Sequence, residues 1–183
     1  MKIESNQKPS ILLNSQSVVL QVNPYQSDSM VSSLIGQEAP DFTLPTSDGG
    51  IFRLSDLDGS WKVIFFYARD GSPTCKRGCL SFKEQHDLFQ SLTPPVEIIG
   101  ISQDSINDHE EFKQKLDLPF PLLSDENRIV SEAYDVPIFL GRFPAKSSFV
   151  IGPDRTIHHC YDWLFRPRRH VARILDSLSR ISR

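Results

Sequence analysis

The apolar positions of the chain first stand out as two short, nearly continuous runs. These are Lys62 to Tyr67 (KVIFFY) and Val96 to Ser102 (VEIIGIS). Runs of this kind are typical of strands that are buried on both faces of a sheet. Between them, Pro73 to Leu92 has apolar residues near one face and a proline suited to a first helical turn, so we predict one helix there. Its predicted end is Thr93-Pro94-Pro95.

Helical and strand-like patterns continue after the second run. A polar, amphipathic helix is predicted over Ser105 to Lys115, with Ser105 as the N-cap and Asp108 three residues on. The later predicted elements are a short strand at Leu122-Leu123, a short helix from Asn127 to Tyr134, strands from Lys146 to Ile151 and from Thr156 to Tyr161, and a closing helix from Pro167 to Ile181.

The order of these elements predicts the fold class. Asp48-Gly49-Gly50 is a turn signal between two short apolar segments, so a small hairpin is expected before the first buried strand. The order that follows is βαβα and then ββα, which predicts parallel strands first and an antiparallel hairpin after them. We therefore expect an α/β protein with the thioredoxin-like layout, a central mixed β-sheet flanked by helices on both faces.

The first part of the chain is different in composition. Residues 1–33 are rich in Ser, Asn and Gln and have little sustained periodicity, so a flexible N-terminal extension is expected, in which Ile11–Leu13 and Val18–Val22 could form short strands. Residues 34–183 are expected to form one domain. The start of the chain lacks the pattern of a secretory signal, and the longest apolar run is too short to span a bilayer. We expect a cytoplasmic location and leave an organellar one open.

Composition narrows the function classes. Hydrophobic residues make up 39% and charged residues 23% of the chain, which is ordinary for a globular protein. The net charge of −3 gives nucleic-acid binding no support. Three cysteines do not make a disulfide framework, and an odd number in a reducing compartment indicates reactive thiols, a metal site or core residues.

One cysteine stands where chemistry is expected. Cys75 lies in the segment Tyr67 to Cys79 (YARDGSPTCKRGC), which follows a buried strand and opens a helix. Ligands of open α/β sheets bind beyond the carboxyl ends of the strands. A free thiol is only about 3% ionised at neutral pH, but unpaired N–H groups and the positive helix end stabilise a thiolate. Lys76 and Arg77 add positive charge. We predict a nucleophilic thiolate; the alternative is a cysteine that only packs the helix start.

Several segments of the chain resemble the peroxiredoxins, most closely the branch of peroxiredoxin Q and bacterioferritin comigratory protein. The matching segments are Gly36 to Pro45 (GQEAPDFTLP), Phe66 through Cys75, Leu122 to Asp125 (LLSD) and Ser148 to Ile151 (SFVI). The resemblance implies reduction of hydrogen peroxide or alkyl hydroperoxides by Cys75 as the peroxidatic cysteine, through a sulfenic acid. It implies no metal or organic cofactor. It also implies recycling by thioredoxin or a glutaredoxin-like reductant.

The chain departs from the family pattern at three positions, two in the cysteine loop and one before the late strand. The family's loop has a proline and a threonine where this chain has Ala68 and Ser72. Ser72 keeps a hydroxyl that can bind thiolate and peroxide. The family's arginine, which holds the thiolate, is replaced by Lys146, which keeps the charge without the forked donor geometry. Arg142 is a nearby, weaker candidate for the same role.

The second cysteine is displaced from the family position. The branch often places its resolving cysteine five residues after the first, where this chain has Leu80, and Cys79 comes one residue earlier. Residues four apart on a helix have Cβ atoms about 5–6 Å apart, whereas a disulfide needs about 3.8 Å. Pairing of Cys75 with Cys79 would thus require the first helical turn to unwind. Cys79 is the candidate resolving thiol; the alternatives are an external thiol and, less favoured, Cys160, which we interpret as a core residue or a minor thiol.

Other functions remain open on the same fold. The spacing Cys75-x-x-x-Cys79 is similar to that of the copper chaperones for cytochrome oxidase, so a copper(I)-binding chaperone with His158 or His159 is one alternative. A thioredoxin-type disulfide reductase would have the motif Cys-x-x-Cys, with one residue fewer between the cysteines. A non-catalytic binding protein is the third alternative. The chain lacks a late Val-Cys-Pro segment, which argues against resolution between subunits, and we expect a monomer or weak dimer that binds no membrane.

Overall fold

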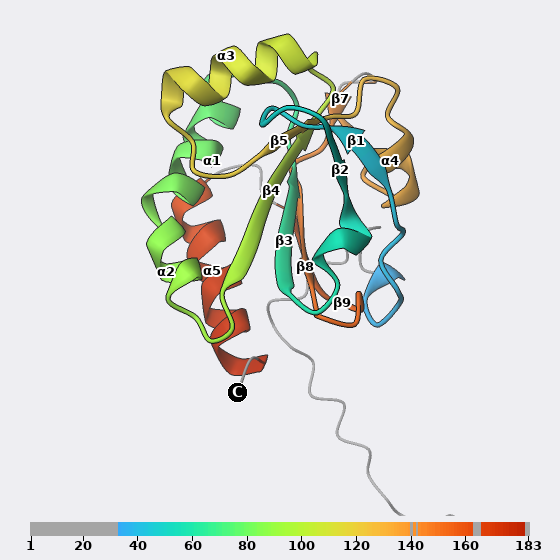
Figure 1. Ribbon diagram of the computed structural model, residues 1–183, viewed down its shortest axis with the longest axis vertical. Helices are drawn as coiled ribbons and strands as arrows, with labels where there is room; N and C mark the ends of the chain where they lie inside the picture. Colours follow the sequence, from blue (N-terminus) through green and yellow to red (C-terminus); the bar gives the residue numbers. More distant parts are fainter. Residues whose placement is uncertain (1–32, 140, 142, 163–165, 182–183) are drawn as a thin grey trace, which may run out of the picture.

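The computed structural model describes residues 33–139, 141, 143–162 and 166–181 of the 183-residue chain. The two short strands predicted before residue 23, and all of the predicted extension except Ser33, lie outside the described residues. Figure 1 shows the arrangement of the described elements.

A five-stranded mixed sheet forms the centre of the molecule. Its strand order is β5-β4-β3-β8-β9, in which β3, β4 and β5 are parallel, and β8 and β9 run antiparallel to their neighbours. The strands are β3 (Trp61–Phe66), β4 (Val96–Ser102), β5 (Leu122–Ser124), β8 (Ser147–Ile151) and β9 (Ile157–Asp162). This confirms the predicted order, in which parallel strands come first and an antiparallel hairpin follows.

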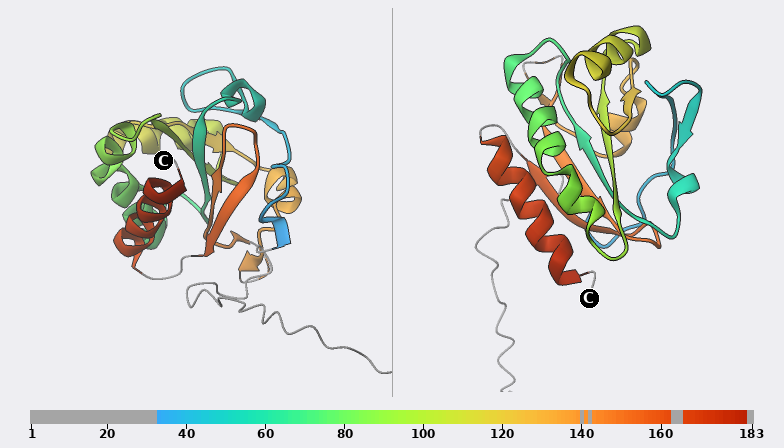
Figure 2. Two further views of the ribbon diagram at one scale, coloured as in Figure 1. Left: turned by 90° about the horizontal axis from the view of Figure 1, so that it is seen from below. Right: turned by 60° about the vertical axis from the view of Figure 1, so that its left-hand side comes forward.

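Helices cover both faces of this sheet, as predicted. The helices are α1 (Pro73–Glu84), α2 (His86–Gln90), α3 (Ile106–Leu116), α4 (Ile129–Ala133) and α5 (Pro167–Ile181). α1, α2 and α5 lie on one face, and α4 lies on the other with the hairpin of β1 (Thr43–Pro45) and β2 (Ile51–Arg53) (Figures 1 and 2). Within the described residues, every helix is too short or too polar to cross a membrane.

Three local features differ from the prediction. The expected single helix over 73–92 is divided at Gln85, whose backbone leaves helical geometry (φ −112°, ψ 6°). This division leaves Phe82 and Phe89 in the same core. The 3₁₀ helix η2 (Leu54–Leu57) and the hairpin of β6 (Ile138–Phe139) and β7 (Phe143–Pro144) were not predicted, because each is too short to show a periodic pattern.

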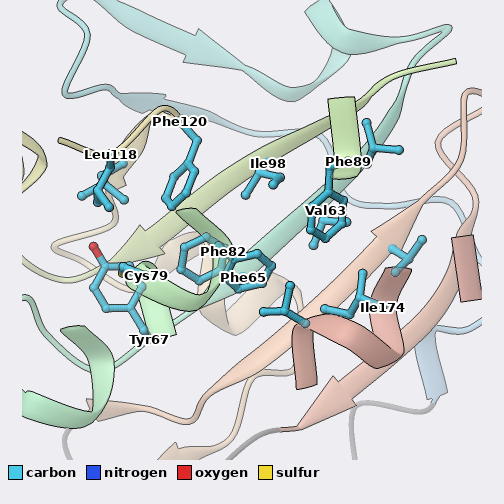
Figure 3. Close-up of a cluster of buried hydrophobic side chains, with 14 of the residues drawn as sticks. Val63, Phe65, Tyr67, Cys79, Phe82, Phe89, Ile98, Leu118, Phe120 and Ile174 are labelled. Atoms are coloured by element: carbon cyan, nitrogen blue, oxygen red, sulfur yellow. The ribbon is translucent and has the colours of Figure 1, made fainter. Parts of the chain in front are cut away.

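Side chains on the two faces of β3 belong to two separate hydrophobic cores. Val63 and Phe65 pack beneath α1, α2 and α5, whereas Ile64 and Phe66 pack toward α4 and the β1–β2 hairpin. Figure 3 shows the first core, where the rings of Phe65 and Phe82 are stacked with centroids 4.3 Å apart. This alternation follows from the two-residue period of a strand. The central strand is therefore held from both sides, and the loop at its carboxyl end starts from a rigid base.

Candidate active site

Cys75 lies at the carboxyl end of the central strand. The chain leaves β3 at Phe66, and α1 begins at Pro73, with Ser72 in extended geometry at the N-cap position. Cys75 is the third residue of α1 and is fully buried, and the first turn contains no acidic residue. The structure thus places this sulfur at the positive end of a helix, where a thiolate is stabilised.

A second hydroxyl accompanies Ser72 next to the cysteine. Ser72 Oγ lies 3.0 Å from Thr74 Oγ1, and both side chains are half-buried. Ser72 does not use its side chain to cap α1, so its hydroxyl remains part of this pair. Thr74 was not singled out from the sequence, although a hydroxyl residue directly before Cys75 was a visible signal.

Lys146 reaches the same edge of the sheet from another strand. It immediately precedes β8, and the register pairs Phe66 with Ser147, so the antiparallel pairing sets Lys146 opposite Tyr67, where the cysteine loop begins. Its side chain is half-buried and has contacts within the protein. Arg142, the weaker candidate, lies outside the described residues.

Cys79 follows one turn later on α1 and is also fully buried with a free thiol. Burial is the main cause that raises the pKa of Cys79 well above its ordinary value, and negative charge at Asp70 and Cys75 adds to it. This thiol is therefore neutral in the folded state. It needs exposure or a change in its surroundings before it can act as a nucleophile.

The third cysteine belongs to the other side of the sheet. Cys160 lies in β9 opposite Phe149 and packs against the core that contains Ile64 and Phe66. Burial, followed by the charge of Asp162, raises the pKa of Cys160 to about 12. Cys160 is partly buried at the border of this core.

The histidines named for the copper alternative do not meet the cysteines. The ring of His158 lies 4.8 Å from that of Trp61, the first residue of β3, whereas Cys75 follows the last residue of that strand. His159 stacks on Tyr161 at 5.7 Å. His158 therefore lies at the end of the sheet opposite the cysteine loop, and His159 lies midway along β9, paired with Val150.

A buried polar network under the loop was not found from the sequence. The Tyr67 hydroxyl donates to Asp70 Oδ1 at 2.7 Å, and His109 Nδ1 lies 2.8 Å from Asp70 Oδ2. His109 Nε2 lies 3.1 Å from the carbonyl oxygen of Leu123. Tyr67 and His109 are fully buried, and Asp70 is nearly so. The available signal was a histidine in line with Phe112 on the inward face of α3.

Asp104 extends this network. Its Oδ2 accepts hydrogen bonds from the backbone N–H of Asp70 at 2.9 Å and from the Ser102 hydroxyl at 2.6 Å. Asp70, Asp104 and His109 are close enough to share a metal ion. Each of the three side chains already has hydrogen-bond partners within the chain, so we interpret the cluster as a hydrogen-bond network.

Comparisons with known proteins agree with this geometry. Peroxiredoxin Q, chloroplastic, of Oryza sativa subsp. japonica is 35% identical over 144 residues, which are 78% of this chain and 65% of the rice protein. A peroxiredoxin bcp of Coxiella burnetii is 42% identical over 113 residues, which are 61% of this chain and 73% of that protein. The chain therefore spans about 65% of the length of the rice relative. None of these relatives supports the copper alternative.

A solved structure has the same fold. The bacterioferritin comigratory protein of Xanthomonas campestris superposes with a TM-score of 0.71 at 26% identity, over 78% of this chain and 92% of that chain. The predicted thioredoxin-like fold class is thereby confirmed. A family model described as the AhpC/TSA family matches residues 35–160. This chain belongs to the AhpC/TSA family, in its peroxiredoxin Q and bcp branch.

Proposed function

We propose that this protein is a thiol peroxidase that reduces hydrogen peroxide and alkyl hydroperoxides through Cys75. The observation that carries the proposal is the position of the Cys75 sulfur in the first turn of α1, directly beyond the carboxyl end of β3. Membership of the peroxiredoxin family supports it. The Xanthomonas campestris relative is described by its alkyl peroxide reduction activity, which supports the same substrate class for this chain.

The first step is a two-electron oxidation of sulfur. The Cys75 thiolate attacks the distal peroxide oxygen, so that an S–O bond forms while the O–O bond breaks. The leaving alkoxide or hydroxide takes a proton and departs as alcohol or water. The hydroxyl of Ser72, backbone N–H groups of α1 and the ammonium of Lys146 stabilise the charge that develops on the oxygens. Both electrons come from sulfur, so the proposal calls for no metal or organic cofactor.

The second step returns sulfur to its starting state. The thiol of Cys79 condenses with the Cys75 sulfenic acid, forming a disulfide and releasing water. A dithiol reductant such as thioredoxin or a glutaredoxin-like protein then attacks this disulfide through a mixed disulfide. Because both sulfurs are buried on an intact helix, the first turn of α1 opens before they join.

Stopped-flow measurement of peroxide consumption tests the assignment. The wild-type protein is expected to consume hydrogen peroxide rapidly, and Cys75→Ser is expected to be inert. Cys160→Ser serves as the matched control and is expected to react like the wild type. If wild type and Cys75→Ser are equally inert, the chain is a non-catalytic binding protein. The wild-type protein is also titrated with Cu(I). Stoichiometric copper binding without peroxide turnover would overturn the proposal.

The organisation of the chain and its setting are further parts of this proposal. We propose that residues 34–183 act as one domain behind a flexible extension, since the two cores draw on residues from Leu34 to Ile181. We also propose a monomer or weak dimer in a reducing, cytoplasmic compartment, which suits three free cysteines. Sedimentation of the reduced and peroxide-treated protein tests the oligomeric state.

A further inference from the structure

A chain of buried hydrogen bonds joins the loop that precedes Cys75 to α3 and to β5, the strand at the edge of the sheet. It begins at Tyr67, the residue after β3, passes through Asp70 in the loop and His109 on α3, and ends at the carbonyl of Leu123 on β5. Asp70 stands five residues before Cys75. The loop that delivers the reactive sulfur is therefore fastened to two elements that carry no other part of the proposed site.

The hydrogen-bond partners of His109 determine how many protons the Asp70–His109 pair binds. The Leu123 carbonyl can only accept, so Nε2 of His109 must carry a hydrogen to bond it at 3.1 Å. Nδ1 then faces Asp70 Oδ2 at 2.8 Å, a separation at which one of the two atoms must be protonated. The other oxygen of Asp70 accepts from Tyr67. The Asp70–His109 pair thus binds one proton more than a carboxylate beside a neutral imidazole, and it is uncharged overall.

The charge of Asp70 acts on the thiol of Cys79. Asp70 is among the groups that raise the pKa of Cys79, after burial, and Cys79 and Asp70 both raise the pKa of Tyr67. Other titratable groups facing this region are Cys75 on α1 and Asp104 after β4. A buried carboxylate without a compensating proton would oppose a thiolate in the same low-dielectric surroundings.

We propose that His109 is a positioning residue of the peroxidase site: it shares a proton with Asp70 that offsets the negative charge of this carboxylate beside Cys79, and it fastens the loop leading to Cys75. This inference rests on the proposed peroxidase function. His109 touches neither peroxide nor sulfur in this scheme, and it acts only through Asp70.

The test is the pH dependence of Cys75 oxidation by hydrogen peroxide in stopped flow. In His109→Gln the imidazole that shares a proton with Asp70 is gone and the carboxylate charge is no longer offset, so the pH of half-maximal rate is expected to rise by about one unit while the rate at high pH is kept. Below that pH the variant is then about tenfold slower. Asp70→Asn removes the charge, so the double variant Asp70→Asn/His109→Gln is expected to return to within about twofold of Asp70→Asn alone.

Matched buried residues serve as controls. His170→Gln removes another buried histidine, which is bonded to Ser148, and is expected to leave the pH midpoint unchanged. The positioning role is overturned if His109→Gln has the wild-type midpoint, or if the double variant is displaced as far as His109→Gln. Tyr67→Phe, compared with Tyr134→Phe, offers a second pair of buried tyrosines: only the first should raise the midpoint, since Tyr134 bonds Pro40.

A measurement on the wild-type protein keeps the inference testable even if the variants fold poorly. Nitrogen NMR of ¹⁵N-histidine protein should show Nε2 of His109 protonated. An unprotonated Nε2 would contradict the proton count. A wild type that is inert toward peroxide would instead remove the proposed function, while the NMR result would still report on the network.

Discussion

Cys79 lies one helical turn after Cys75 on α1, and both side chains are fully buried and unpaired. On intact helix the two sulfurs are too far apart to bond, because Cβ atoms four residues apart are separated by about 5–6 Å. The few backbone bonds of a first turn can open at modest cost, since helix ends have the lowest local stability. Oxidation of Cys75 is therefore expected to be coupled to unwinding of this turn.

Replacement of the second cysteine separates the two chemical steps. Cys79→Ser is expected to keep the rate of the first oxidation within about twofold and to lose at least about tenfold in turnover with thioredoxin, because the sulfenic acid then has no neighbouring thiol. Mass spectrometry after one equivalent of peroxide should find a trapped sulfenic acid in the variant and a Cys75–Cys79 disulfide in the wild type. Full turnover of the variant would assign resolution to an external thiol.

Substitution of Lys146 tests whether its ammonium group stabilises the charge that develops on the peroxide oxygens. Lys146→Met is expected to slow Cys75 oxidation by about tenfold, because a charged hydrogen bond contributes about 1.5–3 kcal/mol. Lys146→Arg should match or exceed the wild type, since the guanidinium adds forked donors. Lys113→Met is the control, since this half-buried lysine pairs with Asp48. Equal rates for Lys146→Met and the wild type would remove Lys146 from the site.

Much of the fold could be predicted because its signals are local. The cap of α3 was expected from Ser105 and Asp108 alone, and the structure shows the Asp108 N–H donating to Ser105 Oγ at 3.3 Å. The run Val96 to Ser102 matches β4 at both ends, since every residue of the run except Glu97 is buried. The predicted closing helix over 167–181 also matches α5. The position of Cys75 followed from the order of strand, loop and helix.

The buried network could not be predicted in the same way. Asp70 and His109 are 39 residues apart in the sequence, and neither residue type is unusual in its own segment. Their pairing arises only when α3 packs beside the loop, which is a tertiary event. The helix break at Gln85 likewise has no local signal, because glutamine favours helices and tertiary packing overrides that preference.

The centre of the sheet allows a direct test of packing at Gly100 in β4. A Cβ atom there would lie 2.7 Å from Leu122 Cδ2 and 2.8 Å from Phe65 Cζ, both in the filled core. Gly100→Ala is therefore expected to lower the free energy of unfolding by about 1–3 kcal/mol, measured by urea denaturation. Gly71→Ala is the control, since its Cβ would meet no such neighbour among the described residues. An unchanged urea midpoint for Gly100→Ala would show that the core rearranges to accept the added methyl group.

His170 links α5 to the sheet and to α1. Its Nε2 lies 2.9 Å from Ser148 Oγ, and its ring lies edge-on to those of Phe82 and Tyr161. Burial, followed by the charge of Arg173, lowers the pKa of His170 to about 3. The unfolded chain, with an ordinary histidine, binds this proton near pH 6.5. The folded state is thus penalised as pH falls below 6.5, and the penalty stops growing near pH 3.

Acidification should therefore destabilise the protein through His170. Between pH 7.5 and pH 5 this residue is expected to remove about 2 kcal/mol from the free energy of unfolding, measured by urea denaturation at each pH. His170→Gln has no imidazole to protonate, so its stability should fall by about 2 kcal/mol less over the same range. Ser148→Ala loses the hydrogen bond but keeps the buried ring, and it should retain the wild-type pH dependence. If His170→Gln also retains it, another group binds the proton on unfolding.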